Sequence, residues 1–579
     1  MFWFLKSTIP TLISFIVILF FYKNYNKIES SKKFLFIFSF FWIFLFIFHY
    51  LLGIYSPVTY NDNATISISR IIHENNYFVG GNFLHDLLGG LDFFGSQSSS
   101  GQYFSLEKLI FKIFPLWVAI LFHKLILIFL SFGGFYLLSN KVFNNSKLSS
   151  ILVASFFSVI NPYATYVTFL HGITFAAIPY VLYVLYYLNT NKLHLFYLTL
   201  TALIISISTS PLHSFPSLLA AILFTPILKK PENYKRYIYF SILLISLTLL
   251  NWSENLYGVY EYGKLSARFQ SSPYEIYWLG TFKYLLSKGN TCLVKCEYLK
   301  YSPFFIITII TIIFSFLFFK KDYLKYYLVI LLVNFLHHIF HFFVNIFSFE
   351  TIKTLNVYNT GFYLYIPVLL LALNIIKNLD FKIAKKFILI FPFFSIILLL
   401  EDKFDLTKKI FFEPQSKLYK IKNLRSSNLP ENIFYRAVST NPHYFFHPNF
   451  ANAYGLSTSD GYTNIIQKNY VEFWNYGVLK KKFSKKNINQ FGGDLYLNRE
   501  NLKTTQELSY YLLNNVNLNN LKLINTKFIL SYVPLKIQNL KLVSGSKILP
   551  YNSFNRSKSD YYKNILKEKI KYLGNPPNI

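Results

Sequence analysis

The sequence predicts a polytopic α-helical membrane protein with about twelve spans, followed by a C-terminal α/β or α+β domain outside the membrane. Of the 579 residues, 53% are hydrophobic and only 14% are charged, whereas in soluble domains roughly a quarter of the residues are charged. Apolar runs such as 8–22 and 34–52 approach the roughly 17–25 residues that a helix needs to cross hydrocarbon. Beyond residue 400 the hydrophobic runs become short, and Asn, Lys and Ser separate them.

The first predicted domain, residues 1–400, is the transmembrane domain. Its first 22 residues lack a clear small-residue cleavage site, so we expect a retained span rather than a removed signal peptide. Short polar turns containing Pro or Gly separate the helices between residues 148 and 228. The expected spans are residues 7–22, 33–53, 113–138, 148–167, 171–188, 194–211, 213–228, 236–255, 303–319, 326–348, 358–376 and 386–400.

The second predicted domain, residues 401–579, is expected to fold outside the membrane. The segments Phe434–Val438, Asp494–Leu497 and Thr526–Val533 have the short β-rich pattern of strands, and Ser559–Tyr572 has the pattern of a helix.

Lysine placement predicts the orientation of the chain. The connections after odd-numbered spans are basic, as at Lys32-Lys33, Lys229-Lys230 and Lys385-Lys386, while the short connections after the fourth and sixth spans carry no lysine. The positive-inside rule puts the basic connections in the cytoplasm of a cell whose inner or plasma membrane holds the protein. The N-terminus, the loops 53–112 and 256–302 and the C-terminal domain then lie outside.

The net charge of +31 does not indicate nucleic-acid binding. Lys, Asn, Ile, Phe and Tyr are all abundant, a bias that AT-rich coding produces unaided, and the chain has no recognisable nucleic-acid module. The two cysteines, Cys292 and Cys296, lie in one predicted outer loop. Their spacing leaves open whether they form a disulfide.

Ionisable residues inside the predicted spans are few. None of the acids falls well inside a span, which argues against an ion-coupled transporter. His123-Lys124 lies near the middle of the third span, where a lysine must face a partner, a cavity or an anionic ligand unless it snorkels to the interface. In the tenth span, His337 and His341 share one helix face; interhelical hydrogen bonding is favoured over a metal site.

The outer loop 53–112 is too long and polar to be a mere connector. It contains the acids Asp62, Glu74, Asp86, Asp92 and Glu107. We therefore expect this loop to carry a catalytic carboxylate, held close to the surface of the membrane.

Five stretches, in this order, resemble YfhO-type bacterial membrane proteins and their shorter uncharacterised relatives, and the overall layout resembles the GT-C class of membrane glycosyltransferases. They are TYNDNATIS (59–67), AILFHKLILIFLSFGGFYLLSNK (119–141), the Pro162…Gly172…Pro179 pattern, YRAVST…YGLSTSDGYTN (435–464) and INTKFILSYVPL (524–535). One departure is GFYLYIP (361–367), where Gly361 replaces an arginine that is frequent in these relatives.

The resemblance implies transfer of a sugar from a polyprenyl-phosphate donor to a cell-envelope glycan or glycolipid at the outer face of the membrane. Such an enzyme needs a carboxylate to accept the proton of the acceptor hydroxyl and cations to stabilise the phosphate leaving group. No organic cofactor is expected, and the need for a divalent metal stays open. Asp62 matches the acid of the family and is the first candidate for the base, although it also suits a helix N-cap. Asp86 is the second candidate.

The remaining candidate residues would bind substrate. For Asp460 and Tyr462 the alternative is an Asp-Gly turn with the tyrosine packed beneath it. The alternatives for the whole chain are a transporter or flippase of a lipid-linked saccharide, and a non-catalytic envelope assembly protein. The substrate-binding candidates are His85, Lys124, Arg268, Lys288, His341, Lys353, Asp460 and Tyr462.

Overall fold

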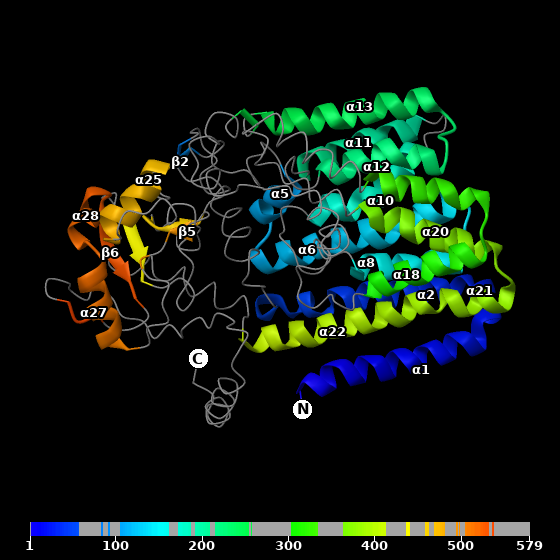
Figure 1. The fold of residues 1–579 in the computed structure, drawn as a ribbon, viewed down its shortest axis with the longest axis horizontal. Helices are drawn as coiled ribbons and strands as arrows, with labels where there is room; N and C mark the ends of the chain where they lie inside the picture. The colour runs from blue at the N-terminus through cyan, green and yellow to red at the C-terminus, as the bar shows by residue number, and fades with distance from the viewer. Residues whose placement is uncertain are drawn as a thin grey trace.

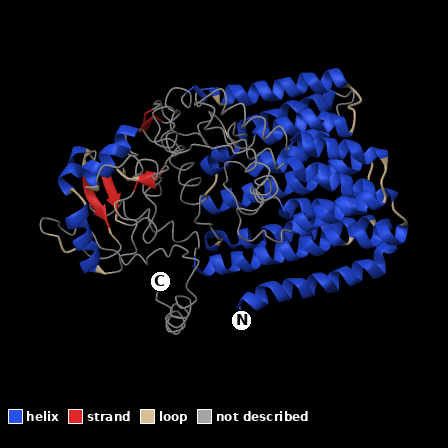
Figure 2. Ribbon diagram, in the orientation of Figure 1, coloured by secondary structure: helices blue, strands red, loops and turns tan. Residues whose placement is uncertain are grey.

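The structure, a computed structural model, is a bundle of helices with a small α/β unit beyond one of its ends (Figures 1 and 2). The loops that are drawn as a grey trace are not described. The structure describes residues 2–56, 83–84, 91–92, 105–160, 172–186, 192–208, 215–253, 256–257, 303–333, 363–412, 436–440, 458–462, 468–480, 494–495, 497, 504–531 and 535–537.

Each predicted span overlaps a helix of the bundle. For the tenth span the overlap is residues 326–333, because the rest of that span lies outside the described residues. The helices of the bundle are α1 (Phe2–Ser30), α2 (Lys32–Ile47), η1 (Phe48–Tyr55), α5 (Leu106–Ile113), α6 (Leu116–Ile128), η3 (Phe129–Gly133), α7 (Gly134–Leu137), η4 (Leu138–Val142), α8 (Lys147–Ile160), α10 (Gly172–Tyr186), α11 (Lys192–Ser208), α12 (Phe215–Leu228), α13 (Tyr234–Asn251), α18 (Pro303–Leu317), η6 (Lys321–Tyr323), α20 (Tyr365–Asn378), α21 (Phe381–Ile388) and α22 (Ile390–Phe412).

Four helical segments in the described part of the chain are long and apolar enough to cross a membrane. They are Thr8–Ser30, Lys32–Tyr55, Leu116–Val142 and Phe381–Phe404, and several shorter apolar helices pack with them. Large apolar side chains such as Phe36, Phe40 and Phe316 are mostly exposed on the bundle, as lipid-facing side chains are in a helical membrane protein. The sequence prediction of an α-helical membrane protein therefore agrees with the fold at this level.

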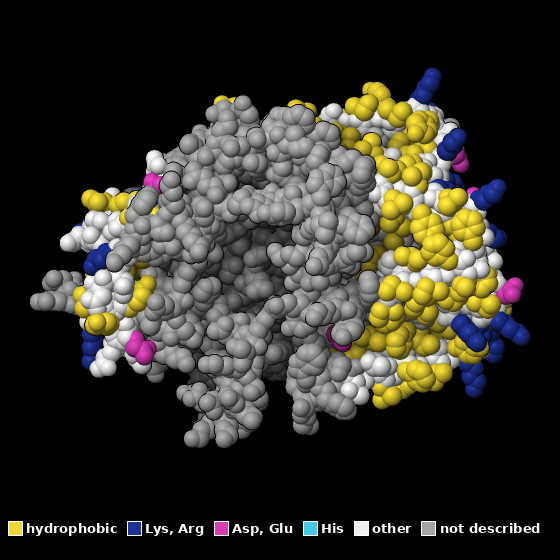
Figure 3. All heavy atoms as spheres, in the orientation of Figure 1, with side chains coloured by type: hydrophobic (Ala, Val, Ile, Leu, Met, Phe, Trp, Pro, Cys, Tyr) yellow, Lys and Arg dark blue, Asp and Glu magenta, His cyan; other side chains and the backbone are white. Residues whose placement is uncertain are grey.

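Lys and Arg side chains gather at the end of the bundle that lies farthest from the α/β unit, and hydrophobic side chains cover the bundle beside them (Figure 3). The basic connections between α1 and α2, between α12 and α13 and between α20 and α21 lie at that end (Figure 1). We call it the basic end. The opposite end faces the α/β unit.

Buried serines form hydrogen bonds between helices of the bundle. These bonds fix how the helices are aligned, which contacts between apolar side chains alone would not do. The Trp42 indole N–H donates to Ser158 Oγ at 3.1 Å, and Ser155 Oγ lies 3.4 Å from Ser395 Oγ. Ser14 Oγ donates to the Phe393 carbonyl at 2.7 Å. These contacts connect α2 with α8, α8 with α22 and α22 with α1. In lipid, hydrogen bonds of this kind between helices specify packing because apolar burial does not.

The third predicted span corresponds to one long helical segment, Leu116–Val142, in which α-helical and π-helical turns alternate. It runs through α6, η3, α7 and η4, and a helix interrupted in this way is often associated with a functional site. Gly134, at the start of α7, touches α10: a Cβ at this position would lie 2.8 Å from both the Cβ and the backbone N of Tyr180. The neighbouring Gly133 has nothing within 4 Å of such a Cβ.

The α/β unit has a hydrophobic core of its own, built around Trp474, Leu508 and Leu512. Strands β3 (Arg436–Ser439) and β6 (Thr526–Leu530) are parallel, and Ala437 forms a parallel bridge with Thr458. All three predicted strands overlap observed ones, while the predicted helix 559–572 lies outside the described residues. The other elements are the antiparallel pair β4 (Gly461–Tyr462) and β5 (Asp494–Leu495) and the helices α25 (Lys468–Glu472), η9 (Phe473–Val478), α27 (Thr505–Asn515) and α28 (Leu518–Leu523).

The helix that precedes the α/β unit is longer than the sequence predicts. The predicted span ends at residue 400, but α22 continues to Phe412. The antiparallel pair β1 (Phe83–Leu84) and β2 (Leu91–Asp92) lies within the long loop 53–112.

Candidate functional site

Most of the predicted site residues lie outside the part of the chain that the structure describes. Lys124, Asp460 and Tyr462 are described, although the side chain of Tyr462 is not. Those outside the described ranges are Asp62, His85, Asp86, Arg268, Lys288, His341 and Lys353, together with the cysteines Cys292 and Cys296.

Lys124 lies on α6 and is 5% exposed. Its Nζ is 5.7 Å from the centroid of the Tyr50 ring, which belongs to η1. A cation over an aromatic face is attracted by the negative face of the ring, and the attraction is stronger where water is excluded. The ammonium is therefore held inside the bundle and does not extend to its surface. This agrees with the alternative in which Lys124 faces a partner and not with the alternative in which it snorkels to the interface.

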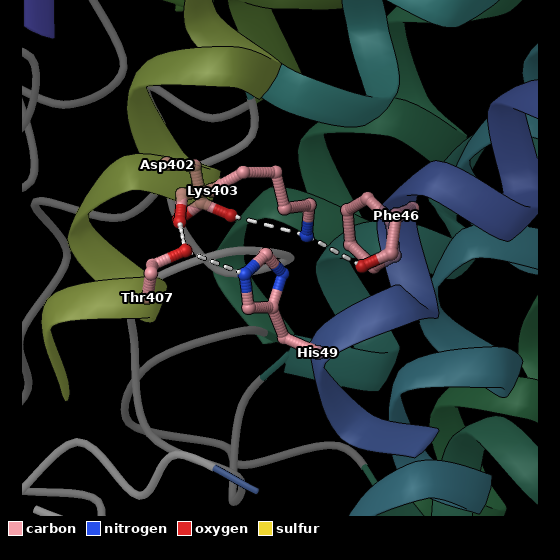
Figure 4. Close-up of polar contacts among 5 residues, drawn as sticks. All are labelled: Phe46, His49, Asp402, Lys403 and Thr407. Atoms are coloured by element: carbon pink, nitrogen blue, oxygen red, sulfur yellow. Dashed lines mark hydrogen bonds and ion pairs between the residues drawn. The ribbon is translucent and has the colours of Figure 1, made fainter. Parts of the chain in front are cut away.

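A second lysine lies close to the same ring. Lys403 Nζ, on α22, is 6.0 Å from the Tyr50 centroid and 5.4 Å from the Phe46 centroid. The ammonium donates to the Phe46 carbonyl at 2.6 Å and lies 3.5 Å from Asp402 Oδ2 (Figure 4). Tyr50 therefore joins two lysines that come from helices far apart in the sequence.

His49, the residue before Tyr50, also contacts α22. Its Nε2 lies 2.9 Å from Thr407 Oγ1 (Figure 4), and Thr407 Oγ1 donates to the Lys403 carbonyl at 2.8 Å. A hydroxyl has only one proton to donate. With that proton on the carbonyl, Thr407 Oγ1 acts as an acceptor toward the imidazole, and His49 donates through Nε2–H in this arrangement. His49 Nδ1 is buried and has no hydrogen-bond partner among the residues that the structure describes.

Glu107 and His123 form a second buried ionisable pair. Glu107 is fully buried at the start of α5, and its Oε1 is 3.8 Å from Nε2 of His123, which is also buried on α6. On the same short helix, Leu109 is 54% exposed and Ile113 is 61% exposed. The helix therefore buries Glu107 together with apolar residues, while two of its large apolar side chains remain exposed on the surface of the bundle.

These contacts define a group of polar residues that we call the buried polar cluster, in which Thr407 is exposed and Asp402 and Lys403 are each 11% exposed. It consists of His49, Tyr50, Glu107, His123, Lys124, Asp402, Lys403 and Thr407. η1, α6 and α22 meet at Tyr50, and α5 joins through Glu107. Asp402, Lys403 and Thr407 are in the second half of α22, which runs from the basic end toward the α/β unit (Figure 1). Two lysines lie over the Tyr50 ring, with Asp402 against one of them, and Glu107 and His123 form a separate pair on the helix that carries Lys124. Such groups can accept a proton and stabilise an anion.

The described residues contain no group of three or more His, Cys, Asp or Glu side chains placed to hold a metal ion. A metal requirement therefore stays an open part of the sequence prediction.

Asp460 in the α/β unit is fully buried. Its Oδ2 accepts a hydrogen bond from the Ser439 backbone N–H at 2.8 Å, and Thr458 Oγ1 donates to the Asp460 carbonyl at 3.0 Å. Burial raises the pKa of the Asp460 carboxyl well above its usual value, and the hydrogen bond from Ser439 opposes this only in part. These contacts connect the end of β3 with the segment that leads into β4, where Gly461 is the first residue of the strand. Both the Asp-Gly turn with a packed tyrosine and acceptor binding by Asp460 and Tyr462 stay predictions.

Sequence reasoning missed several members of the cluster. Glu107 was counted among the loop acids but not singled out, and His49, Tyr50 and Lys403 were not considered. One signal was available for Glu107: in SLEKLIFKI the apolar residues are spaced for a helix, and the helix ends directly before the third span. For Lys403 there was no such signal, because its partners lie on a helix more than three hundred residues earlier in the chain.

Comparison with protein-family models and with curated proteins finds no match to this chain. The resemblance to YfhO-type proteins and to the GT-C class therefore depends on the motifs of the sequence alone.

Proposed function

We propose that this protein is a membrane glycosyltransferase of the GT-C type that uses a polyprenyl-phosphate-linked sugar as donor and a cell-envelope glycan or glycolipid as acceptor. The observation that supports the proposal best is the buried polar cluster, with Lys124 enclosed inside a helical bundle. An isolated lysine inside a membrane costs a few kcal/mol. Because this cost must be offset, we infer that the buried ammonium of Lys124 has a functional role.

The proposed reaction accounts for the types of residue in the cluster. A nucleotide-linked sugar is confined to the cytoplasm, so an enzyme at the outer face must take its sugar from a lipid carrier. The acceptor hydroxyl attacks the anomeric carbon, the bond to the phosphate oxygen breaks, and the lipid phosphate leaves with the electron pair. One carboxylate accepts the proton of the hydroxyl, and cations stabilise the phosphate.

Asp62 is the proposed base, with Asp86 as the alternative, and Lys124 is the proposed contact to the lipid phosphate. Glu107 and His123 hold the corner between α5 and α6 that carries Lys124. The other substrate-binding residues proposed from the sequence keep their assignment: His85, Arg268, Lys288, His341, Lys353, Asp460 and Tyr462.

The proposed topology has about twelve spans, with the basic end in the cytoplasm. The asymmetry of the lysines supports this orientation (Figure 3). It puts the polar cluster near the outer face and the α/β unit outside the cell. Because α22 continues to Phe412, we propose that the outer domain begins after this residue rather than at 401.

Replacing Lys124 by methionine tests the proposal. The protein is reconstituted in liposomes with a panel of radiolabelled polyprenyl-phosphate hexoses and envelope lipid extract, and the sugar transferred to lipid is measured. Loss of one charge-stabilising group is expected to lower transfer by about 10²–10³-fold. Lys385 is the matched control, because its Nζ also lies over tyrosine rings, 4.4 Å from Tyr22 and 5.6 Å from Tyr25.

We expect Lys385→Met to keep most of the transfer, because Lys385 is at the basic end, and Asp62→Asn to abolish it. If Asp86→Asn is inactive while Asp62→Asn is active, the base is Asp86. Movement of the labelled lipid across the bilayer without transfer would replace the proposal with the flippase alternative. Transfer by wild type no greater than in protein-free liposomes would refute the enzyme and leave the assembly protein. Equal transfer by wild type, Lys124→Met and both aspartate variants would refute the roles assigned to these residues.

A further inference from the structure

The contact between His49 and Thr407 connects two segments that lead to different parts of the protein. His49 is in η1, whose last residue, Tyr55, is followed by Ser56 and the long outer loop. Thr407 is in the part of α22 that continues beyond the apolar segment Phe381–Phe404 toward the α/β unit. We call residues 405–412 the stalk. The two segments have no other reason in the sequence to lie together, since 358 positions separate the two residues.

The hydrogen bonds at this contact form a directed chain. The Nε2–H of His49 donates to Thr407 Oγ1, whose proton goes to the Lys403 carbonyl. The ammonium of Lys403 then returns to α2 by donating to the Phe46 carbonyl. α22 and the segment formed by α2 and η1 are therefore joined in both directions within one turn of each helix (Figure 4).

The chain depends on the Thr407 hydroxyl. Within the described residues, His49 Nδ1 has no hydrogen-bond partner, and Nε2 makes the single hydrogen bond of this buried imidazole. Thr407 is exposed, but the ring of His49 is buried, so removing the hydroxyl leaves neither ring nitrogen with a partner among the described residues, which costs free energy. The two segments should then separate locally, without unfolding the bundle.

We infer that His49 and Thr407 are positioning residues, which hold the start of the outer loop against the stalk of the C-terminal unit. The Tyr50 ring, next to His49, carries the same restraint to Lys124 on α6. The contact thus fixes three parts relative to one another: the beginning of the loop 53–112, the buried lysine and the helix leading to the α/β unit. The consequence for catalysis depends on the function proposed above, whereas the mechanical coupling does not.

Hydrogen–deuterium exchange of the full-length protein in lipid nanodiscs tests the coupling. In Thr407→Val, we expect backbone amides in both 48–56 and 401–412 to exchange about tenfold faster, because both sides lose the same restraint. Thr407→Ser keeps the hydroxyl and His49→Gln keeps a donor that can reach it, so both should exchange like wild type.

Thr225→Val is a matched control. Thr225 Oγ1 also donates to the carbonyl four residues earlier, at 2.7 Å from Ala221, and also meets a side chain of another helix, Tyr363 Oη at 2.8 Å. Its replacement should accelerate exchange around α12 but not in 48–56 or 401–412.

Faster exchange of only one of the two segments in Thr407→Val, or of neither, would contradict the inference. Sugar transfer is measured on the same variants. If Thr407→Val lowers kcat with the KM for the donor unchanged and Thr407→Ser restores kcat, the two residues position the site. If the exchange result holds while wild type shows no transfer, the coupling stands and the proposed function fails.

Discussion

The close approach of Gly134 to α10 allows a quantitative prediction about the packing of the third span against that helix. A Cβ at residue 134 would lie 2.8 Å from the backbone N and the Cβ of Tyr180, whereas ordinary contacts to a Cβ begin near 3.4 Å. The obstructing atoms belong to the backbone and the first side-chain carbon, so rotation of a side chain cannot relieve the contact. The two helices must separate by several tenths of an ångström along a tightly packed interface.

Replacing Gly134 by alanine is therefore expected to destabilise the protein by about 1–3 kcal/mol, the usual cost of overpacking. Alanine also favours a helix by about 1 kcal/mol over glycine, so the measured difference combines both effects. Gly133→Ala measures the effect of helix propensity alone, because nothing lies within 4 Å of its new methyl group. This variant should be as stable as wild type or slightly more stable.

The assay is unfolding of the purified protein in mixed micelles, titrated with a denaturing detergent and followed by tryptophan fluorescence. Gly134→Ala should unfold at a clearly lower detergent fraction than Gly133→Ala. Indistinguishable midpoints for the two variants would refute the argument that α7 and α10 touch through Gly134.

Two further predictions concern groups whose hydrogen bonds are buried. Removing the hydroxyl in Ser158→Ala leaves the indole N–H of Trp42 without its 3.1 Å partner and should cost about 1–3 kcal/mol in the same unfolding assay; a midpoint equal to wild type would mean that the two side chains do not meet. For Asp460, burial raises the pKa, so the folded chain holds the proton more tightly than the unfolded chain, and this contribution to stability is lost as pH rises from 3.8 through the raised pKa. Asp460→Asn still offers an oxygen to the Ser439 N–H but cannot ionise, so exchange protection of β3 should decline with rising pH in wild type and not in the variant, and identical pH profiles would contradict the prediction.

The positions of the helices could be predicted from the sequence, but the contacts between the helices could not. Apolar runs and Pro or Gly turns locate the helices because each is a local property of the chain, and the three strands after residue 430 were found from short β-rich segments. The extension of α22 was missed because EDKFDLTKKIFF is polar enough to resemble a domain boundary. Helix formation there continues from an already formed apolar helix, which composition does not reveal.

The candidate site was predictable only where one residue was unusual by itself. Lys124 could be selected because a lysine within an apolar run is costly wherever its partners are. Lys403 and His49 lie at the ends of apolar runs, where charged residues are common, so they stood out only once α2 and α22 were found side by side. Glu107 could not be selected from the sequence because it follows a polar loop, where a glutamate normally faces water.

The exposed apolar side chains of α5 have a practical consequence for handling this protein. This short helix exposes Leu109 and Ile113 while it buries Glu107, an arrangement that is favoured where hydrocarbon covers the first two and protein covers the third. Stripping the annular lipid with a harsh detergent should loosen this helix before the long spans respond. Preparations kept in native lipid are thus the ones in which the buried glutamate and its histidine stay together.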